Sequence, residues 1–205
     1  MISPPTENPS PKLQIYLIRH GQTEWSLSGQ HTGSTDIPLT PHGEDEARRL
    51  RPSIGGIAFS HVLSSPRRRA LRTAELAGIA APIDIEPDLA EWDYGEFEGQ
   101  RSTEIRLTYP DWSIYRDGCP GGESAQQITE RADRLIERLC SLSGTVALFS
   151  HGHFGRALAT RWIGLNLVEA QHFVLGTATV SILGLDPSHP ETRVISSWNI
   201  APPGQ

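Results

Sequence analysis

The sequence predicts an α/β fold, a three-layer sandwich in which a mostly parallel central sheet carries helices on both faces. Short apolar runs alternate with helical segments along the 205 residues, which is typical of strands joined by helical crossovers. One run, 145–149, is apolar almost throughout, as expected of a strand buried on both faces. With 37% hydrophobic residues and a formal net charge of −6, the chain has enough apolar side chains to form a core.

Six runs have the length and composition of strands. Four of them, in the first and last thirds of the chain, are rich in β-branched or aromatic residues, and two are short. They are expected at 13–18, 61–64, 83–86, 145–149, 180–185 and 193–198.

Capping residues mark the helices between these strands. A helix over 40–50 opens with Thr-Pro, and Ser65-Pro66 is expected to open another in the same way. Ser124 and Gln127 form a capping-box pattern ahead of a long helix, and a further helix is expected over 154–163. Apolar residues of the long helix share one face: Ile128, Ala132, Leu135, Ile136 and Leu139.

The domain organisation is simple. We expect one domain over 13–200, with an insert at about 96–144, between a disordered tail over 1–12 and a short tail over 201–205. The first tail has no apolar core of a signal peptide, and no segment approaches the roughly 20 apolar residues of a membrane helix. Two cysteines are too few for a disulfide scaffold. The sequence therefore predicts a cytoplasmic protein without membrane contact.

The positive charge is almost entirely arginine. The chain has 17 arginines and one lysine, Lys12, so an anion site inside the domain must use arginine, whose planar fork suits phosphate. Net acidity and the absence of a basic run of five or more residues argue against nucleic acid as a partner.

Polar side chains follow three of the predicted strands, where α/β proteins bind their ligands. Arg19-His20-Gly21 follows the first strand, and Ser65-Pro66-Arg67-Arg68-Arg69 follows the second. Ser150-His151-Gly152-His153 follows the strand at 145–149. If these strands are neighbours, two histidines and several arginines converge on one edge of the sheet.

In this order, these segments and a glutamate motif resemble the histidine phosphatase superfamily, also called phosphoglycerate mutase-like. The resemblance spans about 15–162 and implies the fold expected above. It is carried by Arg19-His20-Gly21-Gln22-Thr23, by Ser65, Arg69, Ala70 and Thr73, by Glu91, Tyr94, Gly95, Glu98 and Gly99, and by Ser150-His151-Gly152.

The resemblance implies a role for each matching residue. His20 would be the nucleophile that forms a phosphohistidine, and Glu91 would protonate the leaving alkoxide. Arg19, Arg69 and His151 would hold the phosphoryl oxygens, where negative charge spreads in the transition state. No metal and no cofactor is implied. Substrate contacts are implied for Thr23, Ser26, Thr32, Gly33, Trp92, Tyr94, Gly152 and His153, with Thr32 and Gly33 offering backbone N–H groups and Trp92 and Tyr94 walling the pocket.

One position departs from the family pattern. Ser26 stands where many members carry asparagine, six residues after the nucleophile, so its contact with phosphate has a shorter reach. Gly21 and Gly152 lack side chains and are expected to let the backbone approach the phosphate closely.

Other phosphate-binding motifs are excluded by the residues. A Walker A loop needs a lysine inside the domain, which this chain lacks. A cysteine phosphatase needs an arginine six residues after its cysteine, where this chain has Ala125 and Val146. The glycines at 118, 121 and 122 lack the dinucleotide spacing.

A zinc site is a weaker alternative, because two arginines would lie beside the dication. Its ligands would be drawn from His20, Glu91, His151 and His153.

Hydrolysis is favoured over isomerisation. Mutases of the superfamily carry a long insertion with paired arginines, whereas here Glu91 and His151 are 60 positions apart and Arg101, Arg106 and Arg116 are scattered. A short insert leaves the phosphohistidine open to water. We therefore expect a phosphatase for small phosphorylated metabolites.

Three further segments resemble two subgroups, the actinobacterial broad-specificity acid phosphatases and the fungal sedoheptulose-bisphosphatases. The segments are 30–33, 91–95 and 117–124. A phosphoglycerate mutase-type isomerase, a sugar-bisphosphate-specific phosphatase and a non-catalytic phosphate-binding module remain as alternatives, since fold does not fix function. The sequence indicates no oligomeric state.

Overall fold

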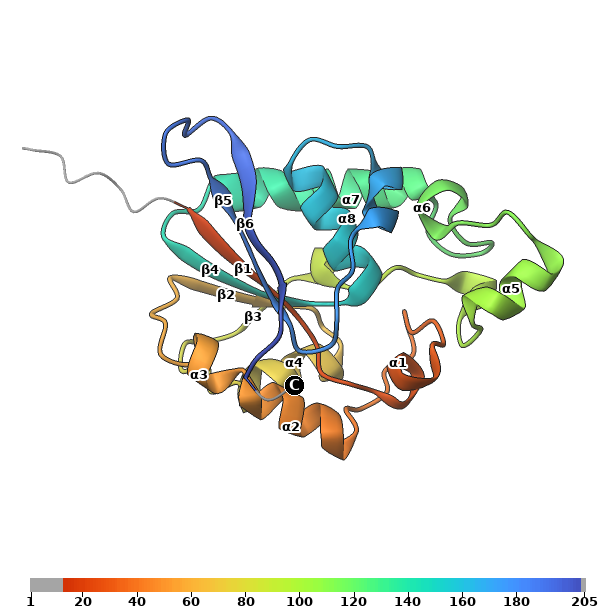
Figure 1. Ribbon diagram of the computed structural model, residues 1–205, viewed down its shortest axis with the longest axis horizontal. Coiled ribbons are helices and arrows are strands. Elements are labelled where there is room, and N and C mark those ends of the chain that lie inside the picture. Colours follow the sequence, from red (N-terminus) through yellow and green to blue (C-terminus); the bar gives the residue numbers. More distant parts are fainter. Residues whose placement is uncertain (1–12, 204–205) are drawn as a thin grey trace, which may run out of the picture.

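A six-stranded sheet in the order β3-β2-β4-β1-β5-β6 forms the middle layer of the computed structural model, which describes residues 13–203 (Figure 1). Among the described strands, β5 alone runs antiparallel to both of its neighbours. The mostly parallel sheet predicted from the sequence is thus confirmed. Its strands are β1 (Gln14–Arg19), β2 (His61–Ser64), β3 (Asp84–Ile85), β4 (Thr145–Ser150), β5 (Val180–Leu185) and β6 (Arg193–Ile200).

The register of the central strands aligns their carboxyl ends. In the β1–β4 pair Arg19 lies beside Ser150, and in the β2–β4 pair Ser64 lies beside Phe149. The residues that follow β1, β2 and β4 therefore emerge at one edge of the sheet, as the positions of the polar motifs in the sequence require.

Helices cover both faces of the sheet (Figure 1). One face packs against α2 (Pro41–Arg49), α3 (Arg51–Ile54) and α4 (Arg68–Leu76), and the other against α7 (Ala125–Cys140) and α8 (Gly152–Trp162). This arrangement confirms the predicted three-layer sandwich.

Alternation along β1 divides the core in two. Ile15 and Leu17 belong to the cluster on the α7 and α8 side, whereas Ile18 belongs to the cluster on the α2 and α4 side. All three side chains are fully buried. Because both faces of the strand are occupied, β1 is fixed in place, and so are the residues that follow it.

Short elements fill the connections, and most of them lie beside the edge of the sheet that carries the polar motifs. They are α1 (Glu24–Ser28), α5 (Ser102–Thr108), α6 (Ile114–Asp117) and the 3-10 helices η1 (Pro87–Leu89), η2 (Gly95–Phe97) and η3 (Leu167–His172).

Two sequence predictions need correction. The expected helix start at Ser65-Pro66 is wrong, because α4 begins at Arg68 and its N-cap residue, Arg67, has no side-chain capping bond. The Ser65 hydroxyl is bonded to His151 at 2.7 Å and accepts the N–H of Arg67 at 3.3 Å, one residue before α4 begins. The helix expected over 154–163 begins two residues earlier, directly after β4.

The segment 96–144, expected as an insert, includes α7, whose buried face is part of the main core. Phe97, Ile105, Ile114 and Tyr115, earlier in the same segment, belong to the same core cluster. The capping box at Ser124 and Gln127 is present. Of the second predicted tail, Pro202 is buried, while the tail over 1–12 and residues 204–205 lie outside the described residues. Among residues 13–203 no helix combines the length and apolar character needed to cross a bilayer.

Candidate active site

Two histidines meet where β1 and β4 end. The ring centroids of His20 and His151 are 5.1 Å apart with their planes at 62°, and both side chains are buried. A cavity of about 230 Å³ opens beside His20. Its lining includes eight of the residues predicted from the sequence: Arg19, His20, Ser26, Thr32, Glu91, Tyr94, Gly152 and His153.

The hydrogen bonds of His20 fix its tautomer. Its Nδ1 lies 2.7 Å from the carbonyl oxygen of Gly21, which can only accept, so Nδ1 carries the proton and Nε2 keeps its lone pair. Burial, and then the charges of Arg69 and Arg19, lower the pKa of His20 well below its ordinary value. The imidazole is therefore neutral, with an unprotonated Nε2, as a nucleophile must be.

The two predicted arginines differ in what they offer a ligand. Arg19 lines the cavity, where Nη1 donates to the Leu175 carbonyl and the buried Nε has no partner among the described residues. Arg69 is fully buried and holds the chain around it, because Nη1 donates to the Thr35 carbonyl at 3.0 Å and Nη2 to that of Thr32 at 2.9 Å. Burial lowers the pKa of both arginines.

His151 lies behind His20 with both ring nitrogens bonded inside the protein. Its Nδ1 accepts from Nε of Arg69 at 3.2 Å, so Nε2 carries the proton and donates to the hydroxyl of Ser65 at 2.7 Å. Burial, and then Arg69, lower the pKa of His151 well below its ordinary value. His151 is thus a neutral donor that adjoins the cavity without lining it.

Glu91 faces the cavity from the loop between η1 and η2. Oε1 accepts from the N–H groups of Trp92 at 2.9 Å and Phe154 at 2.8 Å, and Oε2 accepts from that of His153 at 3.0 Å. Two of these donors belong to the first turn of α8, whose N-terminus favours a carboxylate. Oε2 has one bond and keeps an acceptor position for a proton.

Three of the predicted substrate contacts are engaged elsewhere. Thr23 is the N-cap of α1 and exchanges hydrogen bonds with Ser26. The N–H of Gly33 donates to both carboxylate oxygens of Glu98, at 2.9 and 3.0 Å, so it is not offered to a ligand. Trp92 is a core residue, and its indole N–H donates to the carbonyl of Glu123.

The glycines also differ from expectation. A side chain at Gly21 would lie 2.3 Å from the carbonyl oxygen of Gly43, so this glycine allows the loop after β1 to approach α2 rather than a phosphate. Gly152 does face the site, and a side chain there would lie 3.3 Å from the guanidinium carbon of Arg19.

Sequence reasoning missed several residues that line the cavity. The His31 ring stacks on Tyr94 with centroids 4.6 Å apart, and burial lowers its pKa to about 4. Arg156 lies one turn after Gly152 on α8, and this helical spacing was a signal that could have found it. The other missed lining residues include Trp25, Gln30, Ser102 and Leu175.

Tyr94 and His153 are joined within the cavity wall. The Tyr94 hydroxyl and His153 Nδ1 are 2.6 Å apart, and burial raises the pKa of Tyr94 well above its ordinary value. Tyr94 is therefore the donor, and His153 is neutral because burial lowers its pKa well below the ordinary value.

Within residues 13–203, no group of three or more His, Cys, Asp or Glu side chains is arranged to hold a metal ion. The ring nitrogens of these histidines bond to other groups of the protein: His20 to the Gly21 carbonyl, His151 to Arg69 and Ser65, and His153 to Tyr94.

Comparisons with known proteins agree with this geometry. The profile of the histidine phosphatase superfamily (branch 1) matches residues 15–200. The acid phosphatase of Mycobacterium tuberculosis is 42% identical over 177 residues, which cover 84% of this chain and 87% of that protein. The sedoheptulose 1,7-bisphosphatase of Saccharomyces cerevisiae is 35% identical over 193 residues, which cover 78% of this chain and 70% of that protein.

A solved structure gives the same result for the fold. The product of an open reading frame from Mycobacterium tuberculosis superposes with a TM-score of 0.84 at 39% identity, over 92% of this chain and 97% of that one. The resemblance inferred from the motifs is confirmed, and both subgroups are represented among the relatives. The chain belongs to the histidine phosphatase superfamily, branch 1.

Proposed function

We propose that this chain is a metal-independent phosphomonoesterase that hydrolyses small phosphorylated metabolites through a phosphohistidine on His20. Superfamily membership and similarity to an acid phosphatase support phosphatase chemistry on phosphorylated substrates. The observation that carries the mechanism is the bond from His20 Nδ1 to Gly21, which leaves Nε2 with its lone pair beside the cavity.

The first step transfers the phosphoryl group. Nε2 of His20 attacks phosphorus as the ester P–O bond breaks, and Glu91 gives a proton to the departing alkoxide. Arg19, with an unpartnered Nε in the cavity wall, would bind the phosphoryl oxygens directly. Arg69 adds positive charge behind them, and His151 holds this arginine in place by accepting from its Nε while donating to Ser65.

The second step regenerates the enzyme. The Glu91 carboxylate takes a proton from a water molecule, whose oxygen attacks phosphorus as the P–N bond to His20 breaks. Inorganic phosphate leaves and the imidazole returns to its neutral form. The one free acceptor position of Oε2 serves both proton transfers.

The test is turnover of p-nitrophenyl phosphate in the presence of EDTA. We expect full activity, together with a phosphoryl group on His20 that is labile to acid and stable to base. A non-catalytic phosphate-binding module would give no turnover, and a metal phosphatase would lose its activity to the chelator.

Activity should extend to acid pH. Because the pKa of His20 lies well below 6.5, its Nε2 stays unprotonated as the pH falls below neutral. We expect kcat/KM to be highest below pH 7. A maximum above pH 8 would count against Glu91 as the proton donor.

A sugar-bisphosphate phosphatase is the second candidate. A further cavity of about 500 Å³ adjoins the first and shares Ser102, His153 and Arg156 with it. Arg106 and Arg116 also line this cavity, so a second anionic group has guanidinium partners there. Phosphate release from 3-phosphoglycerate, fructose bisphosphate and sedoheptulose bisphosphate, with isomerisation followed in the same tubes, separates this candidate from a broad phosphatase and from a mutase.

A further inference from the structure

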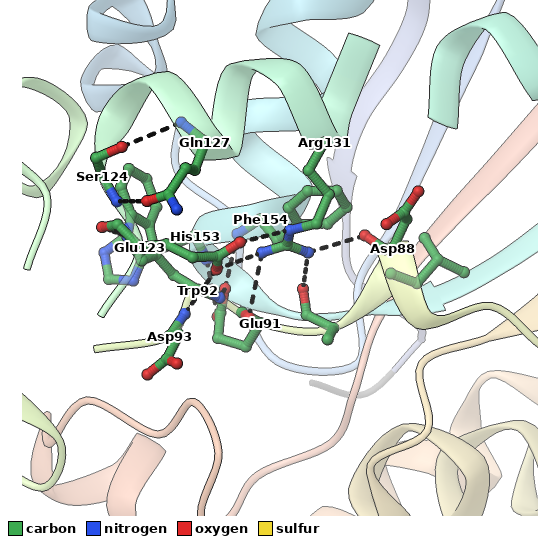
Figure 2. A network of polar contacts seen from close by, with 12 residues as sticks. Asp88, Glu91, Trp92, Asp93, Glu123, Ser124, Gln127, Arg131, His153 and Phe154 are labelled. Atoms are coloured by element: carbon green, nitrogen blue, oxygen red, sulfur yellow. Dashed lines mark hydrogen bonds and ion pairs between the residues drawn. The ribbon is translucent and has the colours of Figure 1, made fainter. Parts of the chain in front are cut away.

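Arg131 lies on α7, outside the cavity, yet it is bonded to the loop that carries Glu91 (Figure 2). Nη1 donates to the carbonyls of Asp88 at 2.9 Å and Ala90 at 2.7 Å, and Nη2 to that of Glu91 at 3.3 Å. The two remaining N–H groups bind the carboxylate of Glu123, at 2.9 and 2.8 Å. All five donors of the guanidinium are therefore engaged.

The same guanidinium also packs on Phe154, a residue that binds the carboxylate of Glu91. Its carbon lies 4.1 Å from the ring centroid of Phe154, whose N–H donates to Oε1 of Glu91. Glu123, which Arg131 holds, accepts the N–H of Asp93 at 2.8 Å. Arg131 thus restrains the loop before and after Glu91 and packs on the residue that binds its carboxylate.

The loop around Glu91 has few other main-chain partners. It runs between η1 and η2 and is not part of the sheet, so the carbonyls of Asp88, Ala90 and Glu91 need donors from elsewhere. A charged group that is only 8% exposed is tolerated when all its donors are bonded. Arg131 gives the backbone carbonyls of this loop the hydrogen bonds that, in a sheet, they would receive from a neighbouring strand.

We propose that Arg131 is a positioning residue for proton transfer, which holds the main chain of Glu91 so that its carboxyl group meets the leaving-group oxygen. The inference rests on the proposed role of Glu91 as proton donor. It extends the site beyond the cavity to the buried face of α7.

The consequence depends on the leaving group. An alkoxide is a strong base and needs the proton as the ester bond breaks, whereas p-nitrophenolate is a weak base and departs without it. A displaced Glu91 therefore slows an alkyl phosphate more than an aryl phosphate. A general loss of folded structure would slow both equally.

The experiment measures kcat/KM, which reports phosphoryl transfer to His20, for glycerol 3-phosphate and p-nitrophenyl phosphate. Arg131→Gln should lower the value for the alkyl ester about 100-fold, as a misplaced catalytic group does, and that for the aryl ester less than about fivefold. Arg131→Lys keeps the charge but loses the planar, forked guanidinium. It should also lower kcat/KM more for the alkyl ester than for the aryl ester, by a smaller factor than Arg131→Gln does.

The matched control is Arg134, one turn further along α7. It is exposed and bonds the side chain of Asp88, at 2.8 and 2.9 Å, rather than the main chain of the loop. Arg134→Gln should leave the ratio between the two esters unchanged. Glu123→Gln, at the partly exposed partner of Arg131, should shift the ratio in the same direction and covers the case in which Arg131→Gln does not fold.

The outcomes separate this inference from the proposed function. Glu91→Gln must itself slow the alkyl ester more than the aryl ester, and an equal loss would overturn Glu91 as the acid. If Glu91→Gln shows the difference but Arg131→Lys and Glu123→Gln slow both esters equally, or neither, the positioning role of Arg131 is wrong. The same shift in Arg134→Gln would also overturn it.

Discussion

The two ends of the cavity are built differently. At the phosphate end His20 lines the cavity, with Arg69 and His151 behind it. The two histidines follow buried strands and Arg69 lies on α4, and all three side chains are at most 4% exposed. The insert end, formed by α5 and α6, consists of helices of seven and four residues. There Leu107 is 85% and Tyr109 51% exposed.

The difference separates chemistry from selectivity. Residues at the phosphate end are placed by the strand register and by hydrogen bonds on most of their polar atoms, so they cannot shift without disturbing the core. The insert end contributes Ile105, Ile114 and Tyr115 to the core cluster, while its exposed residues can change without disturbing the sheet. We therefore infer that catalysis belongs to the first end and recognition of the leaving group to the second.

The largest effect is expected from removing the proposed nucleophile, His20. In His20→Ala no phosphohistidine forms, and kcat for p-nitrophenyl phosphate should fall by about 10⁴-fold or more. Release of p-nitrophenol and mass spectrometry of the trapped enzyme measure both quantities. His189→Ala, at an exposed histidine of the β5–β6 connection, should retain full activity. Undiminished turnover in His20→Ala would falsify the nucleophile assignment.

A smaller loss is expected at Arg19. Arg19→Gln removes the guanidinium whose Nε is unpartnered in the cavity wall, so kcat/KM should fall about 100-fold and inhibition by inorganic phosphate should weaken. For Arg19→Lys we expect a kcat/KM between those of the wild type and Arg19→Gln, because an ammonium group keeps the charge but loses the forked geometry of the guanidinium. Unchanged inhibition by phosphate in Arg19→Gln would remove this arginine from the phosphate end.

The sequence predicted the residues of the phosphate end better than those of the insert end. The strand ends were predictable, because His20 and His151 each follow an apolar run that can only be a buried strand, and parallel strands bring their carboxyl ends together. The motif could not show that Gly33 and Trp92 turn away from the cavity. Their partners are distant in sequence: the N–H of Gly33 donates to the carboxylate of Glu98, and the indole N–H of Trp92 donates to the backbone carbonyl of Glu123.

The insert end was less predictable for a physical reason. Its helices are too short for a periodic pattern, and the orientation of Arg106 on α5 depends on tertiary packing rather than on local propensity. Arg131 was hidden for another reason. On a helix with a clear apolar face, the sequence favours interpreting an arginine as a solvent-exposed charge. Only the structure shows the loop that Arg131 binds.

Stability should fall in mild acid because of the four buried histidines of the site. His20, His151 and His153 have a pKa well below 6.5 in the folded chain, and His31 one of about 4. Below about pH 6.5 the unfolded chain binds more protons than the folded one, so their contribution is complete above that pH and is lost as the pH falls. Each histidine lowers the free energy of unfolding by up to about 1.4 kcal/mol for each pH unit below that value.

Urea unfolding at pH 7.5, 6.5 and 5.5 measures this loss, in a range above the titration of most carboxylates. The free energy of unfolding should be about 1 kcal/mol lower at pH 6.5 than at pH 7.5, and several kcal/mol lower again at pH 5.5. Inorganic phosphate should offset part of the loss by binding the folded chain. A free energy that does not change down to pH 5.5 would mean that these histidines are not neutral in the folded protein.

The smallest effect is expected from Arg156→Gln, on α8 beside the insert end. Its guanidinium is tied by Nε and Nη2 to the carbonyls of Ala170 and Gln171 and lies 5.1 Å from the ring centroid of Tyr115, where the two cavities meet. With p-nitrophenyl phosphate, which has no second anion, kcat/KM should change less than about threefold. With a sugar bisphosphate, KM should rise about tenfold, the value of one charge-assisted hydrogen bond. Equal losses for both esters would place Arg156 among the phosphate ligands, and the division of the cavity into a catalytic and a selective end would fail.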